Sequence, residues 1–246
     1  LSDWFSVNSN ICGYTLCASS KATSDGGTII MTSVFVNGSS SNSDIWIIKT
    51  DSNGVEEWNN TFGGPFYDLG YDIIQNSEGG YTITGRYSYS SFSDMWIINV
   101  DTTGNEIWNK TFGAENSDHG QSIIESGDGG FISLGGQFLE YEDGGDEVLL
   151  VKVDSTGALV WQKTFGAAIT ADYPGTITKT SDGGFMIAGS TYSFGSSSES
   201  HGWLIKIDST GNEVWNKTHS QEKHHISSLV ETPDGGFVGT GYSWNR

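Results

Sequence analysis

Short apolar runs separated by glycine-rich turns dominate the pattern of hydrophobic and polar positions along this chain. Runs such as Ile45–Ile48 and Trp203–Ile205 are apolar at successive positions, whereas a strand with one wet face would alternate. Their short length and the turn residues on either side indicate β-strands covered on both faces.

An acidic-Gly-Gly tripeptide recurs five times and divides the chain into similar units. The second glycines of successive copies are 53, 50, 54 and 52 residues apart. Between them, the pattern Asp-x-x-Gly-x-x-x-Trp occurs four times with identical internal spacing. A fixed period of this length is typical of repeat architectures. The tripeptides begin at Asp25, Glu78, Asp128, Asp182 and Asp234, and the second motif begins at Asp51, Asp101, Asp154 and Asp208.

One complete copy predicts four strands. In the third copy these are residues 122–125, 131–135, 148–153 and 159–164. The acidic-Gly-Gly turn joins the first two strands and Asp-Ser-Thr-Gly joins the last two, both with hairpin chemistry. A small sheet covered on both faces and repeated at this period is a propeller blade. A β-solenoid is the rival, but its usual repeats are much shorter.

The spacing of Trp4 predicts how the ring closes. Trp4 lies 23 residues before Gly27, and the four motif tryptophans precede the next Gly-Gly by 22, 22, 23 and 21 residues. We therefore expect a single all-β domain, a five-bladed β-propeller of four-stranded antiparallel blades, closed by pairing of N- and C-terminal strands. Residues 1–10 would be the outer strand of the split blade and residues 225–246 its first two strands, with complete blades at 14–63, 68–113, 118–166 and 172–219.

The third strand of the split blade matches no segment of the chain. Three explanations stay open: a three-stranded blade, an inward shift of the N-terminal strand, or a chain cut from a longer array. The chain does not start with Met and shows no signal peptide, which is expected of a processed chain or an excised segment.

The net charge of the chain limits the classes of partner that it is expected to bind. The formal net charge is −19, from 30 acidic and 11 basic residues. Such a surface excludes nucleic acid, whose phosphates need basic partners, and docking on anionic membranes. No apolar run approaches the roughly 20 residues of a membrane span, so we expect no membrane insertion within this chain.

The fourth copy carries the family resemblance. Residues 182–189 and 203–215 resemble β-propeller repeats of bacterial and archaeal proteins that are secreted or anchored at the cell surface. The layout also resembles kelch repeats, and Gly135-Gly136 matches their second strand, whereas the other copies depart from it. The tryptophan motif looks like the docking motif of quinoprotein propellers, but no quinone or calcium site carries over. The resemblance implies an extracellular or cell-surface location and says little about activity.

Two groups of residues are candidates for ligand binding. Acidic residues recur at the entry to the first strand, where they form either a ring of carboxylates near the central channel or caps that bond backbone N–H groups. The long variable loops share one face, and aromatic residues there suit glycan stacking or protein contact. The predicted ligand-binding residues are Asp68, Asp118, Asp172, Tyr67, Tyr87, Tyr173 and Tyr192.

Metal and modification sites are less defined. The histidines, of which His219, His224 and His225 lie together, show no zinc-site spacing. The acidic run 140–147 is predicted to be a solvated loop rather than a calcium site. We predict no cofactor. If a cation binds, we expect it to be calcium. Cys12 and Cys17 form a disulfide only if residues 13–16 turn back on themselves. Sequons, which would make the chain a glycoprotein, occur at Asn37, Asn59, Asn109 and Asn216.

No catalytic motif stands out, so the sequence predicts a protein that is not an enzyme. We expect an extracellular or cell-surface recognition or assembly module that presents its loop face to a glycan, a protein partner or a copy of itself. One alternative is a structural subunit of a surface layer or filament. Another is a hydrolase or lyase with its site at the channel mouth, where acidic residues or a histidine would converge.

Overall fold

The computed structural model describes residues 19–38, 41–114, 116–138, 146–167, 170–194, 199–219 and 224–243. The described chain is all-β, with one short 3-10 turn, η1 (Val36–Gly38). Within these ranges, no helix has the length and apolar character that a membrane span requires. The strands form four four-stranded sheets and one two-stranded sheet, all antiparallel.

Each sheet contains strands that follow one another in sequence. The first blade has β1 (Ser19–Ala22), β2 (Thr28–Phe35), β3 (Ser43–Thr50) and β4 (Glu56–Phe62). The second has β5 (Leu69–Gln75), β6 (Tyr81–Tyr89), β7 (Phe92–Val100) and β8 (Glu106–Phe112). The third has β9 (Asp118–Glu125), β10 (Phe131–Phe138), β11 (Asp146–Val153) and β12 (Leu159–Phe165). The fourth has β13 (Asp172–Lys179), β14 (Phe185–Thr191), β15 (His201–Ile207) and β16 (Glu213–His219). The fifth sheet has β17 (His224–Glu231) and β18 (Phe237–Ser243).

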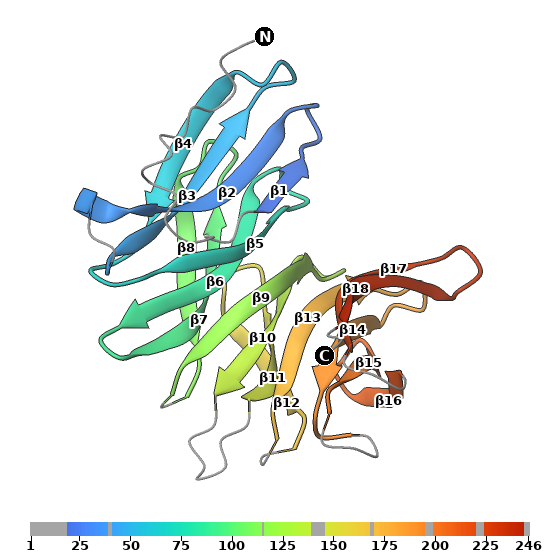
Figure 1. The fold of residues 1–246 in the computed structure, drawn as a ribbon. Coiled ribbons are helices and arrows are strands. Elements are labelled where there is room, and N and C mark those ends of the chain that lie inside the picture. Colours follow the sequence, from blue (N-terminus) through green and yellow to red (C-terminus); the bar gives the residue numbers. More distant parts are fainter. Residues whose placement is uncertain are drawn as a thin grey trace.

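The five sheets are arranged as the blades of a propeller, which confirms the predicted fold class. The first strand of each sheet contacts the first strand of the next, from β1 through β5, β9 and β13 to β17. Figure 1 shows the sheets fanning around these inner strands, from the first blade at the top to β17–β18 at the right. The predicted N-terminal outer strand, residues 1–10, lies outside the described residues.

The core lies between neighbouring blades, because each sheet is covered on both faces. Ile47 on β3 belongs to the same buried cluster as Trp96 and Ile98 on β7. Third strands are accordingly apolar at successive positions, and β7 is buried at every residue from Met95 to Val100. Burial on both faces is the reason these runs lack the alternation of a half-exposed strand.

Motif tryptophans link each of the first three blades to the next. Trp58 lies against Gly104 of the second blade, and its indole N–H donates a 3.1 Å hydrogen bond to the Thr102 carbonyl. Trp108 repeats the contact with Gly157 and donates to the Ser155 carbonyl at 3.0 Å. The indole therefore packs and hydrogen-bonds across the blade boundary.

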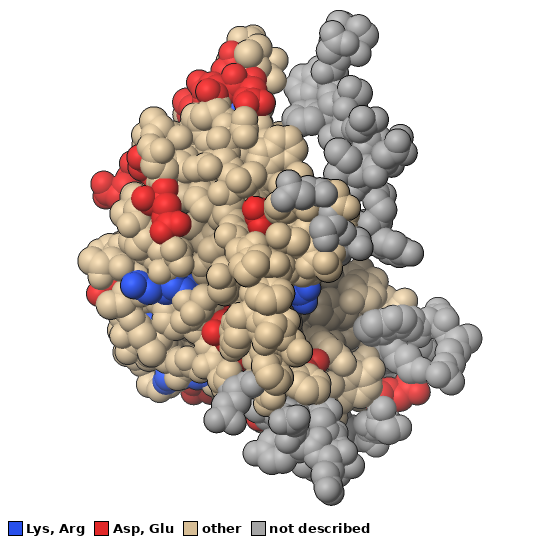
Figure 2. Space-filling view, turned by 90° about the vertical axis from the view of Figure 1, so that its left-hand side faces the viewer, with Lys and Arg blue, Asp and Glu red and all other residues tan. Residues whose placement is uncertain are grey.

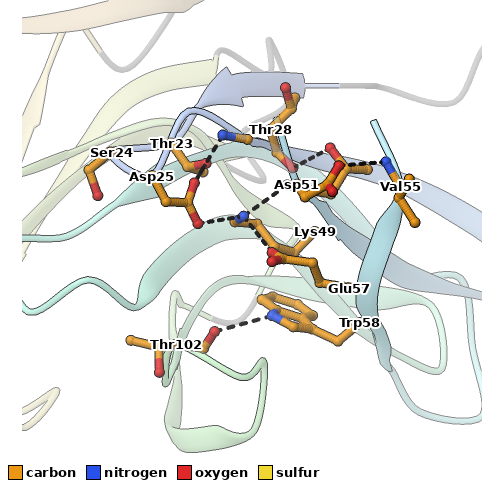
Figure 3. Close-up of polar contacts among 12 residues, drawn as sticks. Thr23, Ser24, Asp25, Thr28, Lys49, Asp51, Val55, Glu57, Trp58 and Thr102 are labelled. Atoms are coloured by element: carbon orange, nitrogen blue, oxygen red, sulfur yellow. Dashed lines mark hydrogen bonds and ion pairs between the residues drawn. The ribbon is translucent and has the colours of Figure 1, made fainter. Parts of the chain in front are cut away.

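Buried lysines anchor the acidic-Gly-Gly turns (Figure 3). In the first blade, Lys49 Nζ lies 2.8 Å from Asp25 Oδ2 and 2.7 Å from Glu57 Oε2, with the lysine side chain 3% exposed. Lys152 with Asp128 and Lys206 with Asp182 repeat this pairing in the third and fourth blades. The paired carboxylates compensate the burial of each ammonium group.

Candidate active site on the loop face

One end of the blades carries the loops that join each sheet to the next, together with the loops between second and third strands. We call this end the loop face. In an antiparallel meander these connections all fall at the same end of the sheets. The tight acidic-Gly-Gly and Asp-x-x-Gly turns lie at the opposite end, so the variable segments of the chain are gathered on the loop face.

The three predicted aspartates lie at the start of the inner strands at the loop face, Asp68 directly before β5 and the other two as first residues of β9 and β13, and all are fully buried. Asp68 accepts N–H hydrogen bonds of 2.6 Å from Gly64 and from Ser88. Asp118 accepts the Ala114 N–H at 2.7 Å, and Asp172 accepts the Ala167 N–H at 3.2 Å. The carboxylates thus tie each inter-blade loop to its inner strand, as the capping interpretation requires. Ligand binding by them stays a prediction.

Asp94 and Asp118 come together from two neighbouring blades. Asp94 lies near the start of β7 in the second blade, and Asp118 begins β9 in the third. A Cβ built on Gly113 would collide with Asp94 Oδ1 and with Asp118 Oδ2 alike. The two carboxyl groups therefore face the same point in the loop that joins these blades, and only a glycine leaves room for both.

Burial changes the acidity of both groups. Burial, together with the nearby charge of Asp94, raises the pKa of Asp118 to about 6, although the hydrogen bond from Ala114 opposes the shift. Burial also raises the pKa of Asp94, whereas the hydrogen bond from Tyr89 lowers it. Within the described part of the chain, Asp118 Oδ1 has no hydrogen-bond partner. Both carboxyl groups therefore hold a proton at higher pH than a free aspartate does.

The hairpin between β6 and β7 places aromatic side chains beside Asp94. Tyr89 and Phe92 pair across a two-residue turn and are 38% and 43% exposed. The Tyr89 hydroxyl donates a 3.0 Å hydrogen bond to Asp94 Oδ1. Ser90 in the turn has φ 60°, the one left-handed backbone conformation of a non-glycine residue in the described ranges. Such backbone conformations cluster at functional sites.

The four predicted tyrosines divide into two groups. Tyr87 packs against Trp96 with ring centroids 5.1 Å apart, and Tyr67 lies under the Arg86 guanidinium at 5.3 Å. Tyr173 and Tyr192 instead form an edge-on pair, 42% and 38% exposed, with centroids 6.3 Å apart. The rings of Tyr173 and Tyr192 are thus more exposed to a ligand than those of Tyr67 and Tyr87.

Sequence reasoning did not select Asp94, Tyr89 or Phe92 as site residues. The two serines between Tyr89 and Phe92 make the shortest second-to-third-strand loop among blades two to four. A turn this short holds its flanking side chains in place, and this was the available signal. The approach of Asp94 to Asp118 had no counterpart in the sequence pattern.

The remaining predicted sites are placed as follows. Asn59, Asn109 and Asn216 lie on outer strands, and each side-chain amide donates a 2.6 Å hydrogen bond to a glutamate three residues earlier. Asn37 lies in η1. Their glycosylation stays a prediction. Cys12 and Cys17, with most of the acidic run 140–147, lie outside the described residues. Among the described residues, no group of three or more His, Cys, Asp or Glu side chains could hold a metal ion.

Acidic side chains outnumber basic ones over the visible surface. Figure 2 shows them densest at the top, the end of the molecule at which the first blade lies. Few basic side chains appear on that face. Exposed acidic side chains thus contribute to the net charge of −19. Such a surface favours the binding of neutral or cationic ligands over anionic ones.

Comparison with known proteins identifies relatives by fold alone. No family model matches the sequence, and no curated protein matches it. A protein of unknown function from Dyadobacter fermentans superposes with a TM-score of 0.64 at 8% identity, over 89% of this chain and 72% of that one. An endo-arabinase from Bacteroides thetaiotaomicron gives 0.53 at 12%, over 95% and 91%. A GH43 β-xylosidase/α-arabinofuranosidase from a compost metagenome gives 0.50 at 11%, over 94% of each chain.

These similarities correct two sequence-based expectations. We expected a protein that is not an enzyme and acts as a recognition or assembly module. The propellers that this fold matches over nearly their whole length include glycoside-cleaving enzymes, which overturns both expectations. Carboxyl groups on separate blades meet only in the folded chain, so no contiguous motif marks their approach in the sequence.

Proposed function

We propose that this protein is a glycan-cleaving enzyme whose active site lies on the loop face, between the second and third blades. The observation that carries the proposal is the meeting of Asp94 and Asp118 beside the exposed Tyr89 and Phe92 rings. The similarity of the fold to an arabinase and a xylosidase supports the same class of substrate.

Asp94 is the acid–base residue in this proposal. It is half-buried, so a substrate can reach it, and its raised pKa brings proton exchange closer to neutral pH. Asp118 is fully buried and therefore acts as a positioning residue. A carboxyl group whose pKa is raised by its surroundings is a usual acid–base group in glycoside cleavage.

The aromatic rings supply the binding surface. Sugar rings stack on exposed aromatic faces, and Tyr89 and Phe92 present such faces on a short hairpin. Tyr173 and Tyr192 form a second exposed aromatic pair, on the fourth blade. We infer that the substrate is a neutral polysaccharide, because the acidic surface disfavours anionic ones. We further infer that the protein acts outside the cell or at its surface, where such polymers occur.

The test is release of reducing sugar from arabinan, xylan and mannan by the purified chain. We expect at least one polymer to be cleaved, and Asp94→Asn to lower the rate by roughly 100-fold or more. Asp44→Asn is the matched control, because Asp44 has a pKa raised by burial and lies near Asp68 in the equivalent position of the first blade. This control should keep its activity.

Thermal unfolding of both variants separates loss of chemistry from loss of fold. If no polymer is cleaved, or if Asp94→Asn and Asp44→Asn cleave equally fast, the proposal is wrong.

A further inference from the structure

A buried lysine lies beside the acidic-Gly-Gly turn in three of the four four-stranded blades. In the fourth blade Lys206 Nζ lies 2.9 Å from Asp182 Oδ1. The ammonium group also donates to the Thr180 hydroxyl and to the Ile207 carbonyl. Figure 3 shows the equivalent lysine of the first blade between two carboxylates. These acceptors define a position in the blade that holds an ammonium group.

The second blade has no lysine at this position. Asn99 pairs with Thr82 across the sheet, as Lys206 pairs with Met186 in the fourth blade. The Asn99 side chain donates a 2.9 Å hydrogen bond to Thr82 Oγ1 and is therefore held at the second strand, away from the turn. Glu78 is the acid of this turn, and no ion pair is found for it among the described residues.

A pocket of about 260 Å³ occupies the ammonium position of the second blade. Its walls include the residues that correspond to those around the Lys206 ammonium group. Asn76, Glu78, Gly80 and Val100 stand where the fourth blade has Thr180, Asp182, Gly184 and Ile207. A Cβ built on Gly184 would collide with Lys206 Nζ, so the glycine that lines the pocket matches one that lies directly against an ammonium group.

A buried acceptor in the wall of the pocket lacks a donor. Asn76 is 9% exposed, and its Oδ1 has no hydrogen-bond partner in the described part of the chain. Ser126 and Thr180 hold the same position in the third and fourth blades, and each accepts a hydrogen bond from the lysine. Because a buried polar atom without a partner is costly, the pocket lacks the donor that a lysine supplies elsewhere.

The remaining walls indicate what kind of molecule fits. Three acidic and three apolar residues line the pocket, and none of the described residues that line it is basic. They are Glu78, Asp101, Glu125, Val100, Ile107 and Phe131. The volume lies just below the roughly 300 Å³ at which pockets for drug-sized ligands begin. A short alkyl chain that ends in a cation matches this size and these walls.

We propose that this pocket, at the end of the blades opposite the loop face, binds the primary ammonium group of an alkylamine. The ammonium group would donate to Asn76 Oδ1 and to the Val100 carbonyl, and would pair with Glu78. Its alkyl chain would lie along Ile107, which is 62% exposed. A free diamine and a lysine side chain of another protein share this chemistry. The site is separate from the proposed cleavage site and does not depend on it.

The test is an NMR titration of the isotope-labelled chain with butylamine hydrochloride at neutral pH. We expect saturable shifts of the Gly80 and Asn76 amide signals, because both residues line the pocket. Butanol has the alkyl chain without the charge, and tetramethylammonium has the charge without an N–H donor. Neither should cause these shifts, because the site requires a charged donor.

Asn99→Lys should abolish the binding of butylamine, since the new side chain would place the chain's own ammonium group in the pocket. It restores the residue type of the other three blades, so thermal unfolding should show a variant at least as stable as the wild type. Asp128→Asn is the matched control, because the third blade already holds Lys152 at this position. This control should bind butylamine as the wild type does.

Two further positions test the acceptors one at a time. Glu78→Gln should weaken the binding of butylamine by roughly fivefold, because the carboxylate is exposed. Asn76→Ala removes an acceptor and should weaken binding by a similar factor. Asn76→Ser should retain most of the affinity, because Ser126 accepts a lysine hydrogen bond at the same position of the third blade.

A comparison of putrescine with α-N-acetyl-lysine amide identifies the source of the ammonium group. Tighter binding of putrescine would assign the site to free diamines, and tighter binding of the lysine derivative to a protein side chain. The absence of saturable shifts with every amine would overturn the proposal. Equal binding to the wild type and to Asn99→Lys would do the same, because the amine would then lie elsewhere. Binding of potassium ions without any amine would assign the pocket to an inorganic cation and would also refute it.

Discussion

Lys206 Nζ lies 2.9 Å from Asp182 Oδ1, although the lysine side chain is 10% exposed and the aspartate side chain is 64% exposed. The lysine also donates to the Thr180 hydroxyl and the Ile207 carbonyl. A buried ammonium group thus depends on a carboxylate that lies largely in solvent.

Replacing Asp182 should therefore cost more than replacing Lys206. Asp182→Asn leaves the buried charge without its counter-ion, and we expect it to lower the free energy of unfolding by about 1 kcal/mol. Lys206→Met removes the charge and keeps the volume, so it should cost less. Urea unfolding measures both. Glu78→Gln is the control, because Asn99 replaces the lysine in the second blade; a cost as large as that of Asp182→Asn would contradict the explanation.

Replacing Gly157 and Gly129 distinguishes the free-energy cost of the backbone conformation from the cost of disturbed packing between blades. Both have positive φ, 81° and 79°, but only a Cβ on Gly157 would meet the Trp108 ring. Gly129→Ala should cost about 1–2 kcal/mol for the left-handed conformation. Gly157→Ala should cost about 1–3 kcal/mol more, because the indole must move. In a Trp108→Ala background the two costs should become equal; if they stay apart, the indole is not the cause.

Asp118 should make stability fall as the pH rises. Its pKa is about 6 in the folded chain and about 4 when unfolded. Raising the pH between these values therefore favours the unfolded chain, up to a plateau above pH 6. The stability of Asp118→Asn relative to wild type should rise across this window, by about 3 kcal/mol at most. Chemical unfolding at pH 4 and pH 7 tests this.

The pH dependence of stability expected from Asp101 has the opposite sign to that expected from Asp118. Hydrogen bonds from Asn105 and Thr103 lower its pKa to about 2, so its stabilisation is present above pH 4 and is lost as the pH falls toward 2. Asp101→Asn should therefore lose stability relative to wild type as the pH rises. If both variants changed in the same direction with pH, the assignment to Asp118 would be wrong.

If the proposed activity is correct, the hydrogen bond from Tyr89 affects the rate through the pKa of Asp94. Tyr89→Phe removes the hydrogen bond that lowers the Asp94 pKa, so the acidic limb of the pH–rate profile should move to higher pH. Tyr192→Phe keeps the exposed ring and does not touch Asp94, and it should leave the limb in place. If the acidic limb of the pH–rate profile does not move in Tyr89→Phe, Asp94 does not carry out the rate-determining proton transfer.

The strand pattern was predictable because each blade is held together by local contacts. The turns at Asp182 and Asp208 join strands adjacent in sequence, and their glycines at positive φ are required by the turn itself. The same local chemistry appears in every copy, so the repeat period, the strand order and the fold class could be predicted from the amino-acid sequence.

The candidate site could not be deduced in the same way. Asp94 and Asp118 belong to different blades, and their approach at Gly113 depends on the angle at which one sheet packs on the next. The sequence also left capping and ligand binding as alternatives for Asp118, whereas its burial and its bond to Ala114 show capping.

The sequence by itself thus determined the repeating blade, because its turns and strand faces involve neighbours along the chain. Only the tertiary structure decided which acidic groups meet and which turn of the next blade Trp58 and Trp108 pack against. Those relationships depend on packing between sheets, which local periodicity does not encode.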